Sequence, residues 1–74
     1  MFEMFQSVKT VVPVPQLGLA SGAKGAIVDI YTSPYPAYEV EFFDDEDNTV
    51  GFLSMRPEEL VSDTFSDSTY KLAA

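Results

Sequence analysis

The sequence predicts a mainly β fold, a small SH3-like barrel of about five strands with one short helical turn. Two observations lead to this fold class. The predicted strands are short, and the first is followed by a long loop that contains glycine and proline. A hairpin and a single helical turn then precede the last strand, an order that fits a small barrel. The 74 residues form one domain, with a core at about 5–60 and either a last strand or a partly flexible tail at 61–74.

The first predicted strand is Val8–Val12, because β-branched residues dominate it. Pro13 and Pro15 end this strand, since proline lacks the N–H group that a sheet interior needs. In the long loop that follows, Leu17 and Leu19 are expected to turn inward and hold the loop against the core.

The second predicted strand covers residues 26–31 and is also rich in β-branched residues. Apolar side chains occur on both of its faces, which favours a closed or nearly closed barrel over a flat sheet. One predicted face of this strand holds Ala26, Val28 and Ile30, and the other holds Ile27, Asp29 and Tyr31.

At the N-terminus, Phe5 is expected to fill one end of the core.

A hairpin is predicted at 37–53, where an acidic turn joins two strands. In the first of these strands, apolar residues alternate with glutamates. Successive side chains of a strand point to opposite faces, so one face is apolar and the other needs water. The apolar face holds Tyr38, Val40 and Phe42, and the water-facing side holds Glu39 and Glu41.

The register of this hairpin follows from its apolar face. If residues 44–48 form the connecting loop, large apolar side chains face each other across the two strands, as cross-strand pairing favours. A shift by one residue would place Phe42 opposite Gly51 and lose such a contact. The predicted pairs are Phe43–Thr49, Phe42–Val50 and Val40–Phe52.

One helical turn is predicted at 56–60. Pro57 suits the first helical position, and the glutamates after it suit the positive N-terminal end of a helix. A fifth strand is expected either to start at Val61 or to lie within Thr69–Leu72.

Composition restricts the function. The net charge is −8, and the four basic residues are scattered, which argues against binding to nucleic acid or to an acidic membrane surface. The chain has neither cysteine nor histidine, so the usual general base and most zinc sites are absent. These features argue against an enzyme and against a cofactor. A cytoplasmic protein that binds a partner with a basic surface is expected.

The densest charge cluster is the acidic turn, and three interpretations remain open for it. An EF-hand loop that starts at Asp45 fails, because its sixth position would be Val50 and its twelfth Arg56. The turn is then a solvated loop, a contact surface for a basic partner, or a weaker cation site. The candidate ligands of that cation are Asp44, Asp45 and Asp47.

Tyrosines and prolines gather at 31–38, and two interpretations are open here as well. Such residues line the grooves in which small barrels bind extended peptides. Alternatively, Tyr38 belongs to the core, while Tyr31 and Tyr35 cap a turn.

Two sequence blocks carry a resemblance to a known family. The block A-Y-E-V-E-F-F-D at 37–44 and the block R-P-E-E-L at 56–60 are similar to a family of short bacterial domains of unknown function. That family is common in cyanobacteria and has an SH3-like barrel. Its genes often lie beside toxin-like genes, so the resemblance implies an antitoxin or immunity role. The chain departs from the family pattern at Ala23, where an acidic residue is usual.

The leading hypothesis is a non-enzymatic, acidic protein-binding module, present as a monomer or a weak homodimer. Phe43 or Tyr35 would provide an apolar anchor beside the acidic residues. A calcium-binding protein is the alternative, and a purely structural domain is the third. The candidate contact residues are Tyr35, Glu39, Glu41, Phe43, Asp44, Asp45, Glu46 and Asp47.

Overall fold

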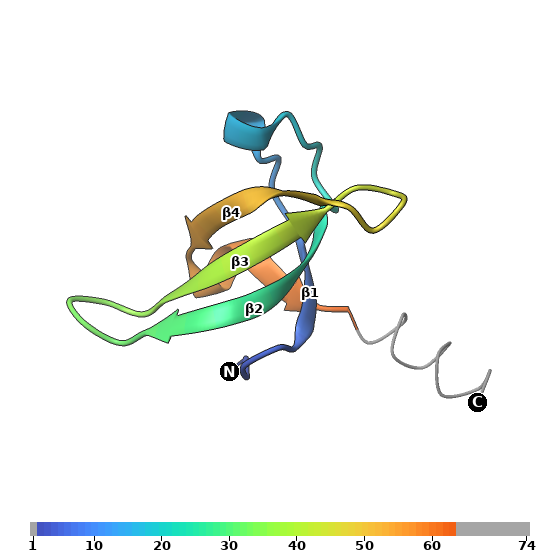
Figure 1. Cartoon of the computed structure of the whole chain (residues 1–74). Coiled ribbons are helices and arrows are strands. Elements are labelled where there is room, and N and C mark those ends of the chain that lie inside the picture. The colour runs from blue at the N-terminus through green and yellow to red at the C-terminus, as the bar shows by residue number, and fades with distance from the viewer. Residues whose placement is uncertain (1, 64–74) are drawn as a thin grey trace.

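The computed structural model describes residues 2–63, which form five antiparallel strands in one open sheet (Figure 1). The order across the sheet is β4-β3-β2-β1-β5. Two 3₁₀ turns interrupt the strands, and this mainly β architecture is consistent with a small SH3-like domain. The elements are β1 Ser7–Thr10, η1 Pro15–Leu17, β2 Lys24–Tyr31, β3 Ala37–Phe43, β4 Thr49–Met55, η2 Pro57–Glu59 and β5 Leu60–Ser62.

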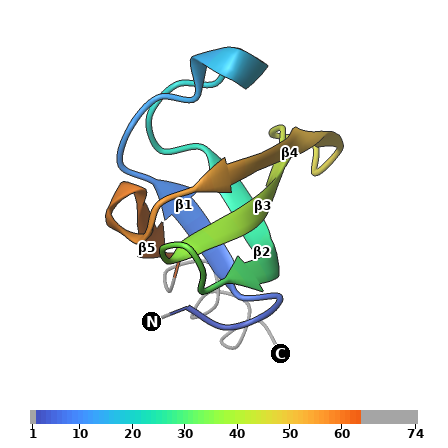
Figure 2. The ribbon, with the colours of Figure 1, turned by 90° about the vertical axis from the view of Figure 1, so that its left-hand side faces the viewer.

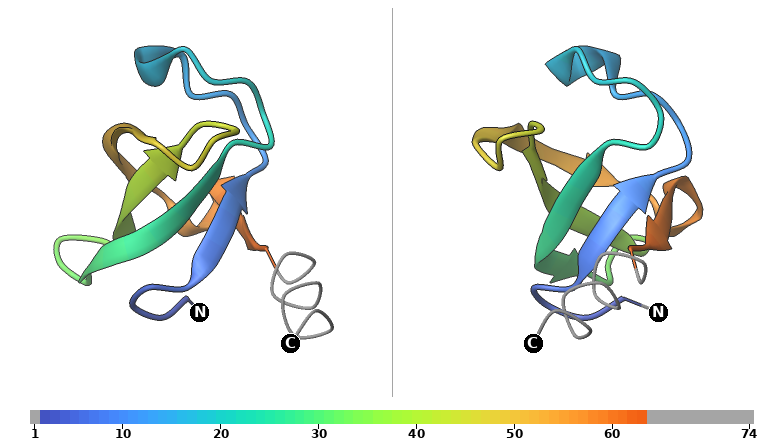
Figure 3. Two further views of the ribbon diagram at one scale, coloured as in Figure 1. Left: turned by 45° about the vertical axis from the view of Figure 1, so that its right-hand side comes forward. Right: turned by 90° about the vertical axis from the view of Figure 1, so that its right-hand side faces the viewer.

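The predicted fold class is confirmed, but the sheet is not closed by hydrogen bonds. The sheet bends strongly on itself (Figures 2 and 3), and β4 and β5 are its two edges. In the described part of the chain, β4 pairs only with β3 and β5 only with β1. The 3₁₀ turn η2 separates β4 from β5, and β5 is only three residues long. The other predicted position of the last strand, Thr69–Leu72, lies outside the described residues.

The core lies on the concave side of the sheet, and β3 contributes most to it. Every second residue of β3 is buried, which confirms the predicted alternation. Leu17 and Leu19, from the loop between β1 and β2, pack against this core as expected. The buried hydrophobic residues are Val8, Val14, Ile27, Tyr38, Val40, Phe42, Met55 and Leu60.

The predicted register of the hairpin is wrong beyond its first pair. Phe43 does face Thr49, but a β-bulge follows and shifts the ladder by one residue. Phe42 therefore lies opposite Gly51, and Val40 lies opposite Leu53. The reason is a long-range contact. A Cβ atom on Gly51 would lie 2.8 Å from Cδ2 of Leu17, so a loop leucine occupies the space that a larger residue would fill.

A second bulge divides β2. The register shifts between Ile27 and Asp29, so the strand does not keep the two faces predicted for it. Ile27 is fully buried, whereas Asp29 and Tyr31, which the sequence predicts to share its face, are both exposed. Ile30 packs against the core after the shift.

The prediction for Phe5 is also wrong. Its side chain is 75% exposed, and its backbone has a positive φ of 66° that turns the chain into β1. Phe2 packs against the core instead, with its ring edge-to-face on Tyr38 at a centroid distance of 5.3 Å. No helix of residues 2–63 has the length and apolar character needed to cross a membrane.

Candidate functional site

The outward side of β3 carries two glutamates in the middle of the sheet. Tyr38, Val40 and Phe42 point into the core, so Glu39 and Glu41 point away from it. The Tyr31 hydroxyl donates to Oε1 of Glu39 at 3.5 Å, and the Thr49 hydroxyl donates to Oε2 of Glu41 at 2.6 Å. Partial loss of hydration around the Tyr31 hydroxyl, together with the charge of Glu39, raises the pKa of Tyr31.

An exposed phenylalanine lies beside these glutamates, and sequence reasoning placed it in the core. Because of the bulge, Phe52 pairs with Glu41 and points to the same outward side, where its side chain is 55% exposed. Val50, the extra residue of the bulge, is exposed as well. The signal for this arrangement was Gly51, because a glycine inside a strand often marks a bulge. We call the outward side chains Glu39, Glu41, Phe52 and Ser54 the β3–β4 outer face.

The acidic turn, residues 44–48, extends from the end of this face, and Asp44 organises it. Oδ1 of Asp44 accepts hydrogen bonds from the backbone N–H groups of Glu46 at 2.8 Å and Asn48 at 2.9 Å. Its Oδ2 atom accepts a bond from the Asn48 side-chain amide at 3.3 Å. Asp47 has a left-handed backbone with φ of 64°, which aspartate tolerates better than most residues. Asp44 and Asp47 are therefore acidic residues that help to form the turn itself.

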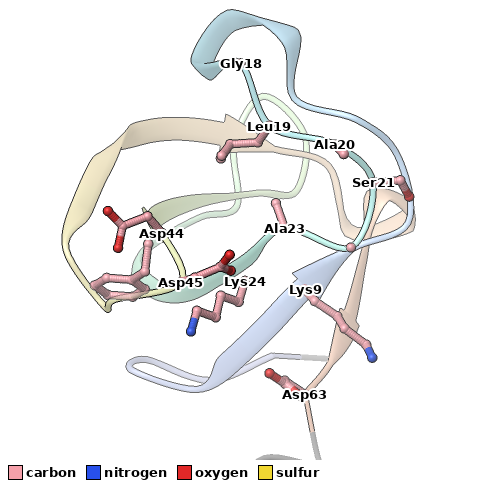
Figure 4. A pocket seen from close by; sticks show the side chains of 12 residues that line it. Lys9, Gly18, Leu19, Ala20, Ser21, Ala23, Lys24, Asp44, Asp45 and Asp63 are labelled. Atoms are coloured by element: carbon pink, nitrogen blue, oxygen red, sulfur yellow. The ribbon is translucent and has the colours of Figure 1, made fainter.

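Lys24 of β2 partly neutralises the turn. Its Nζ atom lies 3.0 Å from Oδ1 of Asp47, and this bond raises the pKa of Lys24. The Lys24 side chain is partly exposed and that of Asp47 is largely exposed, so the pair adds little stability. Lys24, Asp44 and Asp45 border a hollow of about 520 Å³ between the turn and the β1–β2 loop (Figure 4). The side chains of Asp45 and Glu46 accept no hydrogen bond from residues 2–63, and both are exposed to solvent.

The role of Asp44 predicts an acid-sensitive turn. The Asn48 N–H bond, followed by that of Glu46, lowers the pKa of Asp44 below its ordinary value of 3.8. The stability that Asp44 adds is therefore present above about pH 3.8 and is lost as the pH falls through the lower pKa of the folded state. We expect Asp44→Asn to melt at a lower temperature than the wild type at pH 7, with a smaller difference near pH 2. Asp45→Asn is the control, because its side chain takes no part in these bonds. Equal melting curves for Asp44→Asn and the wild type at pH 7 would contradict this role.

The structure does not bring all the predicted contact residues together. Tyr35 and the acidic turn lie at opposite ends of β3 (Figure 1). Tyr35 is 67% exposed and lines a separate hollow of about 640 Å³ with Pro36, Met55 and Pro57. Phe43 is half-buried beside the hollow of Figure 4, so it offers less apolar surface than Phe52. The clustered tyrosines therefore have different environments, because Tyr38 is in the core and Tyr35 is at the surface.

The geometry gives the cation interpretation no specific support. Among residues 2–63, no three or more carboxylates are arranged to hold a metal ion. Asp44 already directs both of its oxygens at donors within the turn, and Asp47 is paired with Lys24. A calcium site requires six to eight oxygen ligands. Calcium binding at Asp44, Asp45 and Asp47 stays a prediction, and these three carboxylates are not arranged around a common ion position.

Comparison with known proteins assigns the chain to a family. The model of a family described as a domain of unknown function, DUF4926, matches residues 4–62. The chain belongs to this family. The DUF4926 match includes all five strands, from β1 to the end of β5. No curated protein and no solved structure matches the chain. Membership in a family of unknown function is confirmed. The cyanobacterial distribution, the SH3-like barrel and the antitoxin role that the resemblance implies for the family stay predictions.

Proposed function

We propose that the protein is a non-enzymatic binding module that holds a partner with a basic surface against its β3–β4 outer face. The observation that carries the proposal is the exposed side chain of Phe52, which pairs with Glu41 across the two strands and lies on the same outward side. An aromatic side chain at the centre of a contact, surrounded by charge, is typical of the residues that dominate binding energy. Asp45 and Glu46 in the acidic turn extend the negative charge beyond the end of the strand.

Charge determines what kind of partner fits. The chain has twelve acidic and four basic residues, so the field around it attracts cationic surfaces and repels anionic ones. Such attraction accelerates association and weakens as salt increases. The antitoxin or immunity role implied by the family resemblance is one form of this function, in which a basic toxin partner would be neutralised by being bound. Phe52, rather than Phe43 or Tyr35, provides the apolar anchor in this proposal.

The test is the recovery of a partner by the intact protein. Immobilised wild-type protein is incubated with lysate of the cells that naturally produce it, and the bound proteins are quantified by mass spectrometry. We expect a protein with a basic surface to be retained at low salt and released as salt rises. Phe52→Ser and the double variant Glu39→Gln/Glu41→Gln should each retain about tenfold less of it, since truncating a central contact typically costs more than 1 kcal/mol.

Matched controls separate this face from general effects of charge and polarity. Val61→Ser removes an exposed apolar side chain from β5, the other edge strand, and should leave retention unchanged. Glu3→Gln/Glu58→Gln removes the same charge from exposed positions outside the outer face. Equal losses in the test and control variants would show that the β3–β4 outer face is not the contact. Retention of no protein by the wild type would contradict the proposal itself.

A further inference from the structure

We infer that the partner contributes an extended, lysine- or arginine-bearing segment, which adds to the sheet as a strand beside β4. This inference rests on the proposed function and specifies how the partner is held. Adding a strand to a sheet edge gives affinity through backbone hydrogen bonds and specificity through alternate side chains. The evidence lies in the composition of β4, the direction of its backbone groups and the charge around it.

The composition of β4 leaves the edge unprotected. Natural proteins discourage pairing at edge strands with charged residues, prolines or very short strands. β4 is seven residues long, Thr-Val-Gly-Phe-Leu-Ser-Met, and contains no charged residue and no proline. Its central residue is Phe52, which is exposed. The opposite edge strand, β5, has only three residues. Of the two edges of the sheet, β4 is therefore the one suited to pairing.

The ladder shows which backbone groups of β4 point outward. Ile27 donates its N–H to Gln6 and accepts a bond from the N–H of Phe5, so its backbone groups face β1 and not β3. Its neighbour in β3, Val40, must then direct its backbone groups toward Leu53 in β4.

Alternation along β4 then directs the backbone groups of Phe52 and Ser54 away from β3, toward the edge of the sheet. Within residues 2–63, no backbone hydrogen bond joins them to another segment. The 3₁₀ turn η1 lies on that side of β4 (Figures 1 and 2). A hollow of about 330 Å³ remains there, between Pro13–Gln16 and Leu53–Arg56. The edge thus has unpaired donors and acceptors, with this hollow next to Ser54 and an exposed side chain at Phe52.

Charge complementarity selects a basic segment over a second copy of the chain. A strand beside β4 lies one strand further from β3, so long cationic side chains can reach over Phe52 toward Glu41 and Glu39. The acidic turn continues the negative charge at the end of β4. A second copy would instead bring another chain of net charge −8 and its own carboxylates to this surface. A basic extended segment of another protein is therefore the occupant that the surface fits.

The experiment uses a synthetic peptide as the probe. A blocked peptide that alternates lysine and valine, equal in length to the seven residues of β4, is titrated into the intact protein. The same peptide with a methyl group on every backbone nitrogen keeps the side chains and the charge but has no backbone donor for a ladder in either strand direction. We expect binding of the first peptide and at least about tenfold weaker binding of the second, because backbone hydrogen bonds are lost. Backbone amide exchange at Phe52 and Ser54 should slow when the first peptide binds.

A pair of variants tests the edge itself. Ser54→Pro removes an N–H that the β3 ladder does not use, and proline is tolerated on the outer side of edge strands. Ser54→Thr keeps that N–H and a hydroxyl. We expect about tenfold weaker peptide binding for Ser54→Pro and a clearly smaller loss for Ser54→Thr. The far-ultraviolet circular dichroism spectrum confirms folding, and the exchange measurement on the wild type does not depend on either variant.

The outcomes separate this inference from the proposed function. Equal binding of both basic peptides, without slower exchange at Phe52 and Ser54, would overturn strand addition while leaving a charge-driven contact intact. Binding of neither peptide would contradict the inference and the proposed function together. Formation of a dimer of the protein alone, with slowed exchange at Phe52 and Ser54, would show that a second copy occupies the edge and would overturn the choice of a basic partner.

Discussion

Phe42→Ala is expected to lower the free energy of unfolding by about 3–5 kcal/mol, because it removes a fully buried aromatic side chain and leaves a cavity. A domain of this length is stable by about 4–11 kcal/mol in total, so the loss takes much of that stability. Phe42 has the largest fully buried side chain of the described core. Its partners on both neighbouring strands are glycines, Gly25 in β2 and Gly51 in β4. No Cβ atom on either side can close over the cavity.

Urea denaturation followed by circular dichroism measures this loss. Phe52→Ala is the matched control, because it removes the same ring from an exposed position on the same hairpin. We expect this control to change the free energy of unfolding by no more than about 0.5 kcal/mol, as for most surface substitutions. Similar losses in the two variants would show that the side chains of the hairpin are not divided between core and solvent as described.

Gly25→Ala is expected to destabilise the fold by about 1–3 kcal/mol through overpacking. A Cβ atom at Gly25 would lie 2.7 Å from the carbonyl oxygen of Glu41 and 2.6 Å from Cγ1 of Val40. The oxygen belongs to the backbone of the paired strand, so it cannot rotate away, and β2 must move from β3. The close approach of the two strands therefore requires glycine at this position.

Gly51→Ala is the control for this prediction. Its added Cβ would meet Cδ2 of Leu17 at 2.8 Å, but that atom ends a flexible side chain in a loop and can shift. We expect Gly51→Ala to cost clearly less than Gly25→Ala in the same urea titration. An equal or larger loss at Gly51 would mean that the contact between Leu17 and β4 is as rigid as the sheet itself.

Local patterns in the sequence predicted the strands well, because alternation and turn residues act over short distances. The faces of β3, the acidic turn and the helical turn at Pro57 all follow from neighbouring residues. The register of the hairpin could not be obtained in this way. It depends on Leu17, which is far from Gly51 in the sequence and reaches β4 only in the folded chain. Cross-strand pairing alone favoured Val50 opposite Phe42.

The register predicted for the hairpin also determines where the apolar anchor is expected. The sequence predicts that Phe52 faces Val40 in the core, and it points to Phe43 or Tyr35 as the apolar anchor. The bulge reverses this assignment and exposes Phe52 beside Glu41. The acidic residues were found from sequence because charge density is visible there. Their division into turn-forming and exposed groups depends on hydrogen bonds that only the fold shows, such as those of Asp44.

Recording the backbone amide NMR shifts of the intact protein during titration with the lysine–valine peptide tests most directly whether the β3–β4 outer face is the contact surface. We expect saturable shifts that are largest at Phe52 and Ser54, extend to Glu39 and Glu41, and weaken as salt is added. Shifts centred on Tyr35 and Glu58, which border the separate hollow at the other end of β3, would contradict this assignment. A titration with no saturable shift anywhere would contradict it as well.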